Sequence, residues 1–463
     1  MTLIGLADAT PRVLWHDSVN WSAYERDLPV PTEVDVAIIG GGFTGLWTAL
    51  WLKEFQPSLS IAILEREHIG FGASSRNGGW CSAAIPTSMP RLTQISDATR
   101  ARAAAQVMQS MVREFGQMVN DLGIDCDFKQ SGTFVAARSP VQEQRARAEV
   151  IDARQWGAAD SDLQWLPAMS AARIAAMDQL LGGTFTPHCA SINPAKLVVG
   201  LAAEVHRRGV MIHEEVTVAS HDEGTVRTSR GIINAQVVVR ATEGYTGSMQ
   251  QYRRSFAPVF SLMLATAPLP ADVLDAIALP PGMTFADYRH LVIYGQRTAD
   301  NRIAFGGRGA PYHFGSRIDA RFDQNSDVHT GLHRILVGMF PQLRDIAITH
   351  TWGGALAVPR DWTVSMGFDR ARKYAWSGGY LGDGVAMSFV GGRLLAELIS
   401  GKTSALSQLP WIGHESRNWE LEPWRFIGIT GGLKAMTWAD AAEARTGRPS
   451  RIAEVINRSL GRH

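Results

Sequence analysis

Three glycines and one acid in this sequence have the types and the spacing that bind a dinucleotide. Gly40 permits a tight turn, Gly42 lets the backbone approach a pyrophosphate, and Gly45 lets a helix pack close to a strand. Free N–H groups at the start of that helix attract the anion. Glu65 can accept hydrogen bonds from both ribose hydroxyls, and its charge would repel a 2′-phosphate. We therefore predict a dinucleotide site, to which the neighbouring Phe43, Thr44 and Arg66 also contribute.

These residues need a strand, a turn, a helix and a second strand to position them. The apolar run at 34–39 precedes the glycines, and a second run, 61–64, ends at the acid. This order is the layout of a dinucleotide-binding βαβ unit. A purely structural glycine turn is the alternative, and the flanking strands and the position of Glu65 argue against it.

A second segment of small and polar residues follows the second strand. The segment lies where the part of a cofactor that extends beyond the adenosine half would pass. Nicotinamide enzymes have no particular need for such a second binding segment. The sequence contains no second GxGxxG pattern, so we expect no nicotinamide nucleotide beside the first cofactor. The candidate ligands in this segment are Gly72, Ala73, Ser74, Arg76, Asn77, Gly78 and Gly79.

The GxGxxG unit joined to the Gly-Ala-Ser-x-Arg-Asn-Gly-Gly segment resembles the FAD-dependent D-amino-acid oxidase superfamily, most of all its gamma-glutamylputrescine oxidoreductase branch. Further landmarks of the resemblance are 237–242, 352–354 and 379–384, so it extends along nearly the whole chain. It implies an α/β and α+β fold, in which a Rossmann-like FAD-binding βαβ domain is interleaved with a substrate domain of mainly antiparallel sheet plus helices.

The resemblance also implies further FAD contacts. A glycine loop at 374–384 leads into a predicted helix at 385–399, whose start would face the flavin pyrimidine edge and favour the reduced anion. Standing alone, this loop would be interpreted as a structural turn before a core helix. The additional FAD contacts implied are Val218, Ala241, Thr242, Gly353, Gly382, Asp383, Gly384 and Val385.

The predicted elements divide the chain into interleaved segments. We expect an N-terminal arm at 1–31, an FAD-binding domain formed by 32–93, 191–247 and 352–402, a substrate domain formed by 94–190 and 248–351, and a C-terminal extension at 403–463. Apolar spacing predicts helices at 102–122, 142–156, 194–208, 328–339 and 451–460, and strands at 127–136, 210–213, 234–241, 260–266, 291–294 and 303–307.

In this superfamily the flavin takes a hydride from the carbon that bears an amine, and the imine then hydrolyses to an aldehyde or ketone. Carboxylates and aromatic side chains near the flavin would hold the amine and tune its proton. The candidate catalytic residues are Trp80, Asp383, Arg308, Tyr288 and Tyr294. Structural roles are the alternatives: core packing for the tryptophan, sheet stabilisation for the tyrosines and a surface ion pair for the arginine.

One departure from the superfamily narrows the substrate. Glycine- and sarcosine-type oxidases resemble one another in a Gly-Leu-Arg-Pro stretch whose arginine can grip a carboxylate, and here Leu356 occupies the arginine position. We therefore expect an amine or amide-linked diamine rather than a simple α-amino acid, with Arg308 or Arg360 as alternative carboxylate ligands. An amino-acid or hydroxy-acid dehydrogenase is the second interpretation, and a non-catalytic flavin-binding protein the third.

The FAD is expected to be non-covalent. No cysteine follows Cys189, and Arg76 stands near the position where some relatives attach the flavin through histidine. Several relatives activate oxygen with a lysine, yet none lies between Lys196 and Lys373, so the electron acceptor is either oxygen or another molecule.

Composition adds exclusions. A net charge of +1, with dispersed basic residues, gives no reason to expect nucleic acid or an anionic membrane as a partner. Three cysteines without CxxC spacing indicate neither a metal site nor a disulfide framework. Neither a signal peptide nor a membrane span is evident, which favours the cytoplasm. The oligomeric state is open.

Overall fold

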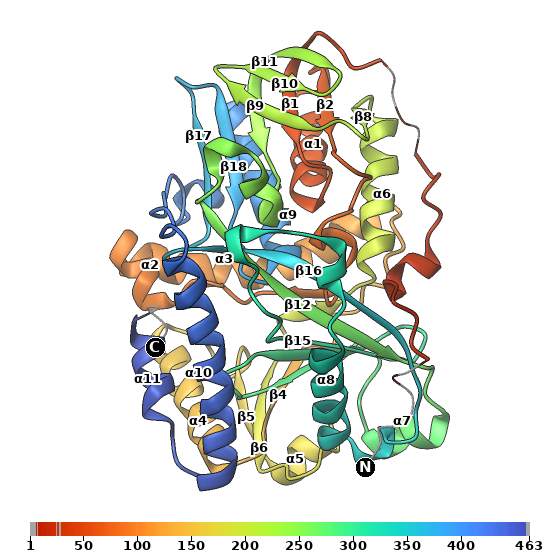
Figure 1. The fold of residues 1–463 in the computed structure, drawn as a ribbon, viewed down its shortest axis with the longest axis vertical. Coiled ribbons are helices and arrows are strands. Elements are labelled where there is room, and N and C mark those ends of the chain that lie inside the picture. The colour runs from red at the N-terminus through yellow and green to blue at the C-terminus, as the bar shows by residue number, and fades with distance from the viewer. Residues whose placement is uncertain (1–5, 7, 25, 27–28, 460–463) are drawn as a thin grey trace.

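A computed structural model describes residues 6, 8–24, 26 and 29–459 of the chain. Two large sheets lie one above the other along the long axis of the molecule, and the C-terminal helices run beside the lower one (Figure 1). Part of the predicted arm at 1–31 and Leu460, the last residue of the predicted final helix, fall outside the described residues.

The first sheet has the order β17-β18-β11-β1-β2-β8, with β10 beside β11 and β9 beside β10. The central pairs are parallel, as a βαβ unit requires, whereas β17 and β10 pair antiparallel with their neighbours. Its strands are β1 (Glu33–Ile39), β2 (Ile61–Leu64), β8 (Met211–His213), β9 (Val218–Asp222), β10 (Thr225–Thr228), β11 (Gly231–Arg240), β17 (Ser365–Asp369) and β18 (Tyr374–Gly378).

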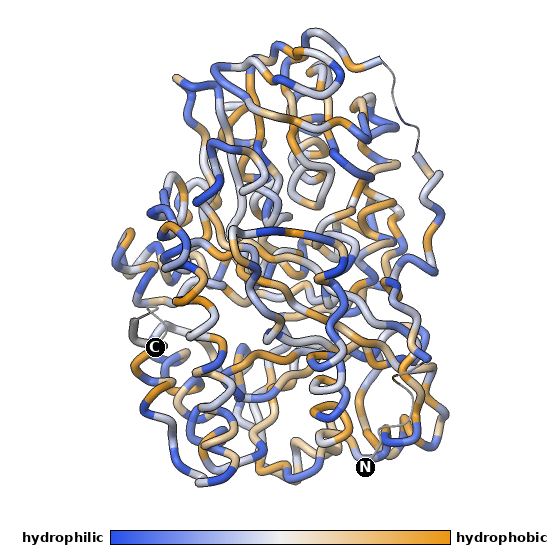
Figure 2. Tube along the Cα trace, in the orientation of Figure 1, coloured by the Kyte–Doolittle hydropathy of each residue, from blue (hydrophilic) through white to orange (hydrophobic). Residues whose placement is uncertain are grey.

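The second sheet has the order β16-β12-β15-β14-β13-β4-β6-β5. Its β13 and β4 pair in parallel, and the other neighbours pair antiparallel. Figure 2 colours the long strand β12 largely orange, as its almost complete burial requires. The strands are β4 (Thr133–Ala137), β5 (Gln164–Pro167), β6 (Gly182–Thr186), β12 (Phe256–Thr266), β13 (Thr284–Asp287), β14 (Ile293–Arg297), β15 (Ile303–Arg308) and β16 (Ile348–Pro359).

Helices pack on both sheets. The strands β3 (Trp80–Ser82) and β7 (Cys189–Ser191) pair with each other in a separate two-stranded sheet. The helices are α1 (Phe43–Phe55), α2 (Met89–Ile95), α3 (Ala98–Asp121), α4 (Pro140–Gln155), α5 (Ala168–Ala172), α6 (Pro194–Arg207), α7 (Ala271–Ile277), α8 (Ser326–Met339), α9 (Gly384–Ser400), α10 (Trp424–Thr446) and α11 (Arg451–Ser459). Single 3-10 turns are η1 (Leu14–Ser18), η2 (Ala73–Ser75), η3 (Glu243–Ser248), η4 (Gln250–Tyr252), η5 (Phe314–Ser316), η6 (Ala320–Asp323), η7 (Pro341–Leu343) and η8 (Ala405–Gln408).

Each predicted helix and strand has a counterpart within a few residues of its expected place. The strand expected at 127–136 shows the largest shift, because β4 begins only at Thr133 and an isolated bridge at Lys129 is the other pairing in this stretch. No helix was predicted where α10 lies, and its 23 residues include Gly428, Gly431 and Gly432. Glycine lowers intrinsic helix propensity by about 1 kcal/mol per residue relative to alanine, which explains why the only helix predicted in the extension was the one at 451–460.

The predicted domains stay a prediction, although strand membership supports them. All strands of the first sheet come from 32–93, 191–247 and 352–402, and β4–β6 and β12–β15 of the second sheet come from 94–190 and 248–351. The expected boundary at 352 falls inside β16, which belongs to the second sheet.

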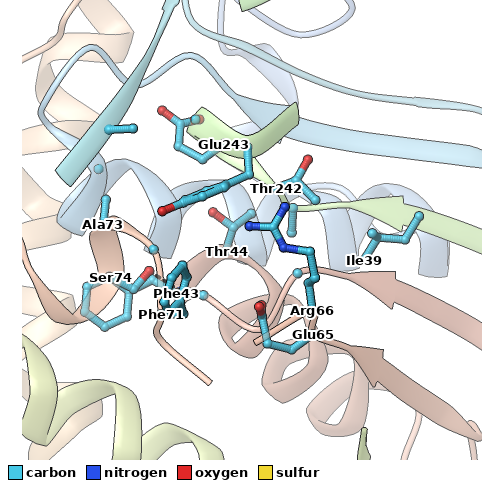
Figure 3. Close-up of a pocket in the computed structure, with 18 of the residues that line it drawn as sticks. Ile39, Phe43, Thr44, Glu65, Arg66, Phe71, Ala73, Ser74, Thr242 and Glu243 are labelled. Atoms are coloured by element: carbon cyan, nitrogen blue, oxygen red, sulfur yellow. Dashed lines mark hydrogen bonds between the residues drawn. The ribbon is translucent and has the colours of Figure 1, made fainter. Parts of the chain in front are cut away.

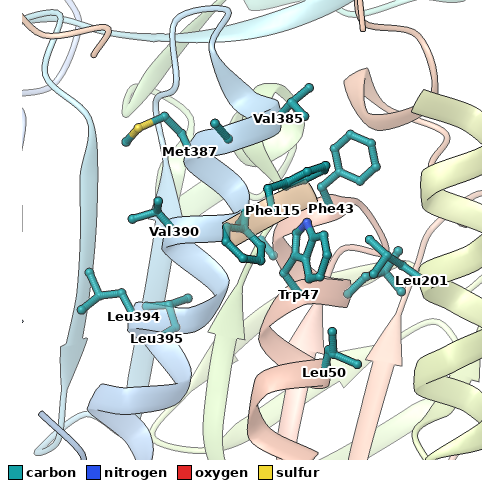
Figure 4. Close-up of a cluster of buried hydrophobic side chains, with 14 of the residues drawn as sticks. Phe43, Trp47, Leu50, Phe115, Leu201, Val385, Met387, Val390, Leu394 and Leu395 are labelled. Carbon is teal, nitrogen blue, oxygen red and sulfur yellow. The ribbon is translucent and has the colours of Figure 1, made fainter. Parts of the chain in front are cut away.

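The two helices that start at the predicted cofactor segments, α1 and α9, lie directly against each other. Gly392 makes this possible, because a Cβ there would lie 2.5 Å from Trp47 Cβ and 2.8 Å from the Thr48 amide nitrogen. Around the crossing, Trp47 packs edge-on against Phe115 and Phe389 in a buried cluster (Figure 4). The close crossing therefore places both helix starts on the same side of the first sheet.

Replacing Gly392 with alanine tests this crossing. Because the added methyl group would have to displace backbone and Trp47, we expect Gly392→Ala to lower the free energy of unfolding by about 1–3 kcal/mol. Gly331→Ala in α8 is the matched control: its Cβ would meet nothing within 4 Å, so stability should stay unchanged or rise. Denaturant unfolding of both variants measures the effect, and equal stabilities would contradict the close-approach explanation.

Candidate functional site

A cavity of about 310 Å³ lies at the carboxyl ends of β1, β2 and β11, in the crevice where an open α/β sheet binds ligands. Separate segments of the chain line it together, as Figure 3 shows for Glu65, Ser74 and Glu243. The predicted FAD residues that line it are Gly40, Gly42, Phe43, Thr44, Glu65, Arg66, Gly72, Ala73, Ser74, Asn77, Val218, Ala241, Thr242, Gly382, Gly384 and Val385.

The glycine turn has the geometry that its sequence predicts. Gly40 has a φ of +107°, and a Cβ there would lie 2.5 Å from the carbonyl oxygen of Ala241 on the neighbouring strand. Gly45 does not line the cavity. A Cβ on it would lie 2.1 Å from the Gly40 carbonyl oxygen, so this glycine lets α1 pack against β1.

The second segment closes over the start of α1. Ser74 Oγ accepts the amide N–H of Phe43 at 2.9 Å, and a Cβ on Gly42 would lie 2.8 Å from the same oxygen. A side chain at position 42 would therefore displace Ser74 from the start of α1. Asn77, behind Ser74, donates to the carbonyl oxygens of Ala73 and Ser74 and thereby holds the η2 turn closed.

Glu65 stands at the end of β2, as predicted, with its carboxylate buried. It accepts the amide N–H groups of Gly41 at 2.8 Å and Glu67 at 3.0 Å, while burial raises its pKa. An ionised carboxylate has about four lone-pair sites, so two backbone bonds leave room for two ribose hydroxyls.

The loop before α9 is tied to the nucleotide turn by a tyrosine that the sequence did not single out. The hydroxyl of Tyr380 lies 2.9 Å from Thr44 Oγ1 and 2.7 Å from Ser377 Oγ. It lines the same cavity and is almost fully buried. The first and the last cofactor segments are thus joined by one hydroxyl.

Glu243 is a second cavity-lining residue that sequence reasoning missed. It follows β11 with a φ of +38°, a strained conformation for a residue with a side chain. Its carboxylate accepts the amide N–H groups of Gly379 at 2.9 Å and Tyr380 at 3.2 Å. Burial raises the pKa of Glu243 to about 7, against the lowering effect of these amides and of Arg240. The only available signal was an acid directly after a buried strand.

Other predicted FAD ligands support the cavity from outside. Gly78 approaches the ring of Tyr294, and Gly79 approaches the Gln296 side chain. Gly353 faces Leu262 and η6 instead. Asp383 is the residue immediately before α9, but it does not line the cavity.

Arg76 also lies behind the cavity and links the two sheets. It donates to the Phe71 carbonyl oxygen at 2.8 Å and forms an ion pair of 2.5 Å with Asp323 of η6. Trp352 of β16 donates to the carbonyl oxygen of Arg76 at 2.8 Å. Burial raises the pKa of Asp323 to about 6, although Arg76 lowers it. Arg76 therefore orders the second segment against the second sheet.

Four of the five candidate catalytic residues come close together beside the cavity. The rings of Trp80 and Tyr294 lie edge-to-face at 6.2 Å, and the Tyr294 hydroxyl is 2.8 Å from Ser261 Oγ. Arg308 donates to the carbonyl oxygen of Leu381, and burial lowers its pKa while the charge of Asp383 raises it. The four residues come from β3, β14, β15 and the loop before α9.

The structure places Tyr288, the fifth candidate, with a different set of neighbours. Its hydroxyl lies 2.7 Å from Thr184 Oγ1 and donates to Glu149 on α4. Arg145, also on α4, donates to its carbonyl oxygen at 2.7 Å. None of these neighbours lines the cavity, so Tyr288 holds α4 on the second sheet.

These residues fit FAD. Gly42 and Gly72 line the cavity without side chains, the start of α1 is suited to an anion, Glu65 suits a ribose, and the start of a second helix, α9, lines the same cavity. A family model described as FAD dependent oxidoreductase matches residues 35–398. The chain belongs to this family.

Relatives and solved structures agree with the family. The gamma-glutamylputrescine oxidoreductase of Escherichia coli strain K12 is 29% identical over 392 residues, which cover 81% of this chain and 86% of that protein. A probable oxidoreductase of Haemophilus influenzae is 26% identical over 86% of this chain and 90% of its own length. The predicted cofactor, FAD, is therefore confirmed, and the solved structures that follow confirm the predicted fold class.

Among solved structures, the glycine oxidase of Geobacillus kaustophilus superposes with a TM-score of 0.69 at 21% identity, covering 83% of this chain and all of that chain. The L-proline dehydrogenase of P.horikoshii gives 0.67 at 20% identity, covering 82% and 98%. These likenesses establish a shared fold. Within the described residues, no helix is both long and apolar enough to cross a membrane.

The buried carboxyl of Glu243 predicts a pH dependence. Its folded-state pKa of about 7 lies above the ordinary 4.5, so its stabilising protonated form is lost as the pH rises through this window. We expect the stability of the wild type relative to Glu243→Gln to fall by on the order of 3 kcal/mol between pH 4.5 and 7.5. Thermal or denaturant unfolding with saturating FAD measures this difference.

Glu215→Gln is the matched control, because Glu215 also has a positive φ of 58° but its side chain is 83% exposed. Its stability difference from the wild type should show no comparable slope. Parallel pH curves for the wild type and Glu243→Gln would show that Glu243 does not titrate in this window.

Proposed function

We propose that this FAD-dependent oxidoreductase oxidises a small amine at the carbon next to nitrogen. The observation that carries the proposal is the convergence of Trp80, Tyr294, Arg308 and Asp383 from separate elements beside the loop that begins α9. When bound, FAD accepts the hydride. The chain's own residues have to hold the amine, exclude water and adjust the amine proton.

Each of the four side chains has a role that its chemistry supports. Trp80 and Tyr294 form an apolar wall that would exclude water and pack against the carbon skeleton of the substrate. Asp383 supplies a negative charge, which attracts an ammonium group. Arg308 faces Asp383 and is anchored on Leu381, so it moderates that charge and keeps the loop in place.

An amine substrate fits these four side chains better than a simple α-amino acid does. Leu356 lines the cavity at the position where an arginine would grip a carboxylate. The E. coli relative is named for gamma-glutamylputrescine, an amide-linked diamine, and we extend that substrate class to this chain as a proposal.

The buried Arg308 favours one alternative, an amino acid whose carboxylate would pair with its guanidinium. A hydroxy acid would use the same pairing. Four further expectations stay predictions: the residues assigned to FAD and substrate, non-covalent FAD, a cytoplasmic location, and either oxygen or another molecule as electron acceptor.

Anaerobic reduction of the flavin tests the proposed function. We expect amines, and amide-linked diamines above all, to remove the flavin absorbance in the absence of oxygen, with an aldehyde as the product. Amino acids and hydroxy acids form the comparison panels. Loss of absorbance with those panels alone would replace the amine by the alternatives, and no loss with any panel would favour a flavin protein without this activity.

Asp383 provides a test at the level of one residue. Because an ammonium group loses a charged partner, Asp383→Asn should weaken amine binding roughly tenfold, while FAD affinity changes less. Titrations of substrate and of FAD measure the two affinities separately. Asp160→Asn, whose side chain is 96% exposed, is the control and should change neither. Equal losses of both affinities would assign Asp383 to the cofactor site instead.

A further inference from the structure

The C-terminal helix α10 is fixed on the second sheet by its inward side. Phe426 and Ile429 pack against a buried cluster that contains Tyr312 and Leu381. At the other end, Asp440 accepts the amide N–H groups of His290 at 2.7 Å and Leu291 at 3.0 Å. These attachments determine which side of α10 points away from the molecule.

The outward face of α10 is unusually apolar for an exposed surface. The exposed fractions are 69% for Trp424, 55% for Ile427 and 67% for Trp438. A surface helix normally carries polar residues on this side. Among the described residues, half of the exposed large hydrophobic side chains lie between Leu421 and Val455. We define the outward face as Trp424, Ile427, Gly428, Gly431, Lys434, Trp438 and Ala441.

The glycines of α10 are not required for packing within the monomer. A Cβ on Gly428, Gly431 or Gly432 would meet nothing within 4 Å, so intramolecular packing does not require them. Each costs about 1 kcal/mol of helix propensity relative to alanine. Glycines on a helix face allow a second backbone to approach closely. The face thus combines two bulky indoles with a flat central strip.

The face is symmetric about Gly431. Trp424 lies seven residues before it and Trp438 seven residues after it, which is roughly 10 Å in each direction. A two-fold axis at Gly431 would therefore bring Trp424 of one copy against Trp438 of the other. An isologous interface requires this kind of reciprocal contact.

The same axis also fits the remaining side chains. Lys434 is the charged residue of the outward face as defined, and the axis would set it opposite Gly428 of the other copy. The two lysines would therefore not face each other, and each would have space. Arg445 is also exposed on this side of α10, fourteen residues from the axis, where it would lie beyond the start of the other copy's α10. Leu421, 64% exposed, would lie opposite the small Ala441.

The exposed tryptophans supply part of the area that a dimer needs. Indole side chains bury about 150–250 Å² each, and the two tryptophans are roughly two-thirds exposed. In a symmetric pair they would bury roughly 400–650 Å² in total, about half of the smallest specific interfaces. Leu421, Ile427 and the glycine strip extend this area. The helix also lies beyond residue 398, where the match to the family ends.

We propose that the outward face of α10 is a homodimer interface, in which two copies of this chain pack their α10 helices antiparallel about an axis at Gly431. The interface is independent of the proposed reaction. It assigns a function to a segment that lies beyond the residues matched by the family model.

The test is the mass of the FAD-loaded protein in solution. Sedimentation or light scattering should give twice the chain mass of 50.5 kDa. Gly431→Glu places like charges on the axis while improving helix propensity, and it should weaken dimerisation at least about 30-fold, as changes at the centre of an interface do. Gly331→Glu, at another open helix glycine, is the control and should stay dimeric.

A cross-linking experiment checks the position of the axis. Gly431→Cys should be joined to its copy by a short bis-maleimide, whereas Thr437→Cys, exposed on another side of α10, should not be. The three natural cysteines are buried and serve as the background. A dimer without this cross-link, or one that survives Gly431→Glu, would overturn the proposal.

A membrane surface is the competing occupant. Flotation with vesicles of phosphatidylcholine and phosphatidylglycerol distinguishes it. A wild-type monomer would overturn the homodimer whether or not it binds the vesicles. Vesicle binding that Gly431→Glu abolishes would reassign the face to lipid. Flavin absorbance and unfolding midpoints are measured for all variants, so that a loss of dimer caused by misfolding is recognised.

Discussion

The close crossing of α1 and α9 is the contact on which the site depends. Both helices begin at the cavity, and each start offers free N–H groups to a negatively charged part of the cofactor. Only a glycine at position 392 lets the two helix axes come this close, because a Cβ there would overlap Trp47 and Thr48. The cofactor geometry is therefore set by packing two turns away from the cavity.

Polar contacts then fix what the crossing brings together. Tyr380 joins the loop before α9 to Thr44 on α1, and Glu243 binds two amides of the same loop from the end of β11. Burying a carboxylate is unfavourable unless its oxygens are hydrogen-bonded, and here the loop backbone supplies the donors. Arg76 and Asp323 play the corresponding part between the second cofactor segment and the second sheet. Each cofactor segment is thus held by at least one partner from a distant part of the chain.

The sequence was most informative where local rules operate. The glycines at 40, 42 and 45 and the acid at 65 act within one βαβ unit, so their spacing was enough to place them. Tyr380 and Glu243 act through partners far along the chain, which no spacing reveals. Tyr288 could be assigned to the inserted sheet but not to a side of it, and its contacts with α4 were beyond prediction. The low intrinsic helix propensity of the glycines in α10 argued against a helix that tertiary packing stabilises.

The extension connects to the site through its inward side. Phe426 and Ile429 of α10 pack in the cluster that holds Leu381, and Leu381 is the residue whose carbonyl anchors Arg308. A displacement of α10 would therefore reach the loop before α9 through one layer of side chains.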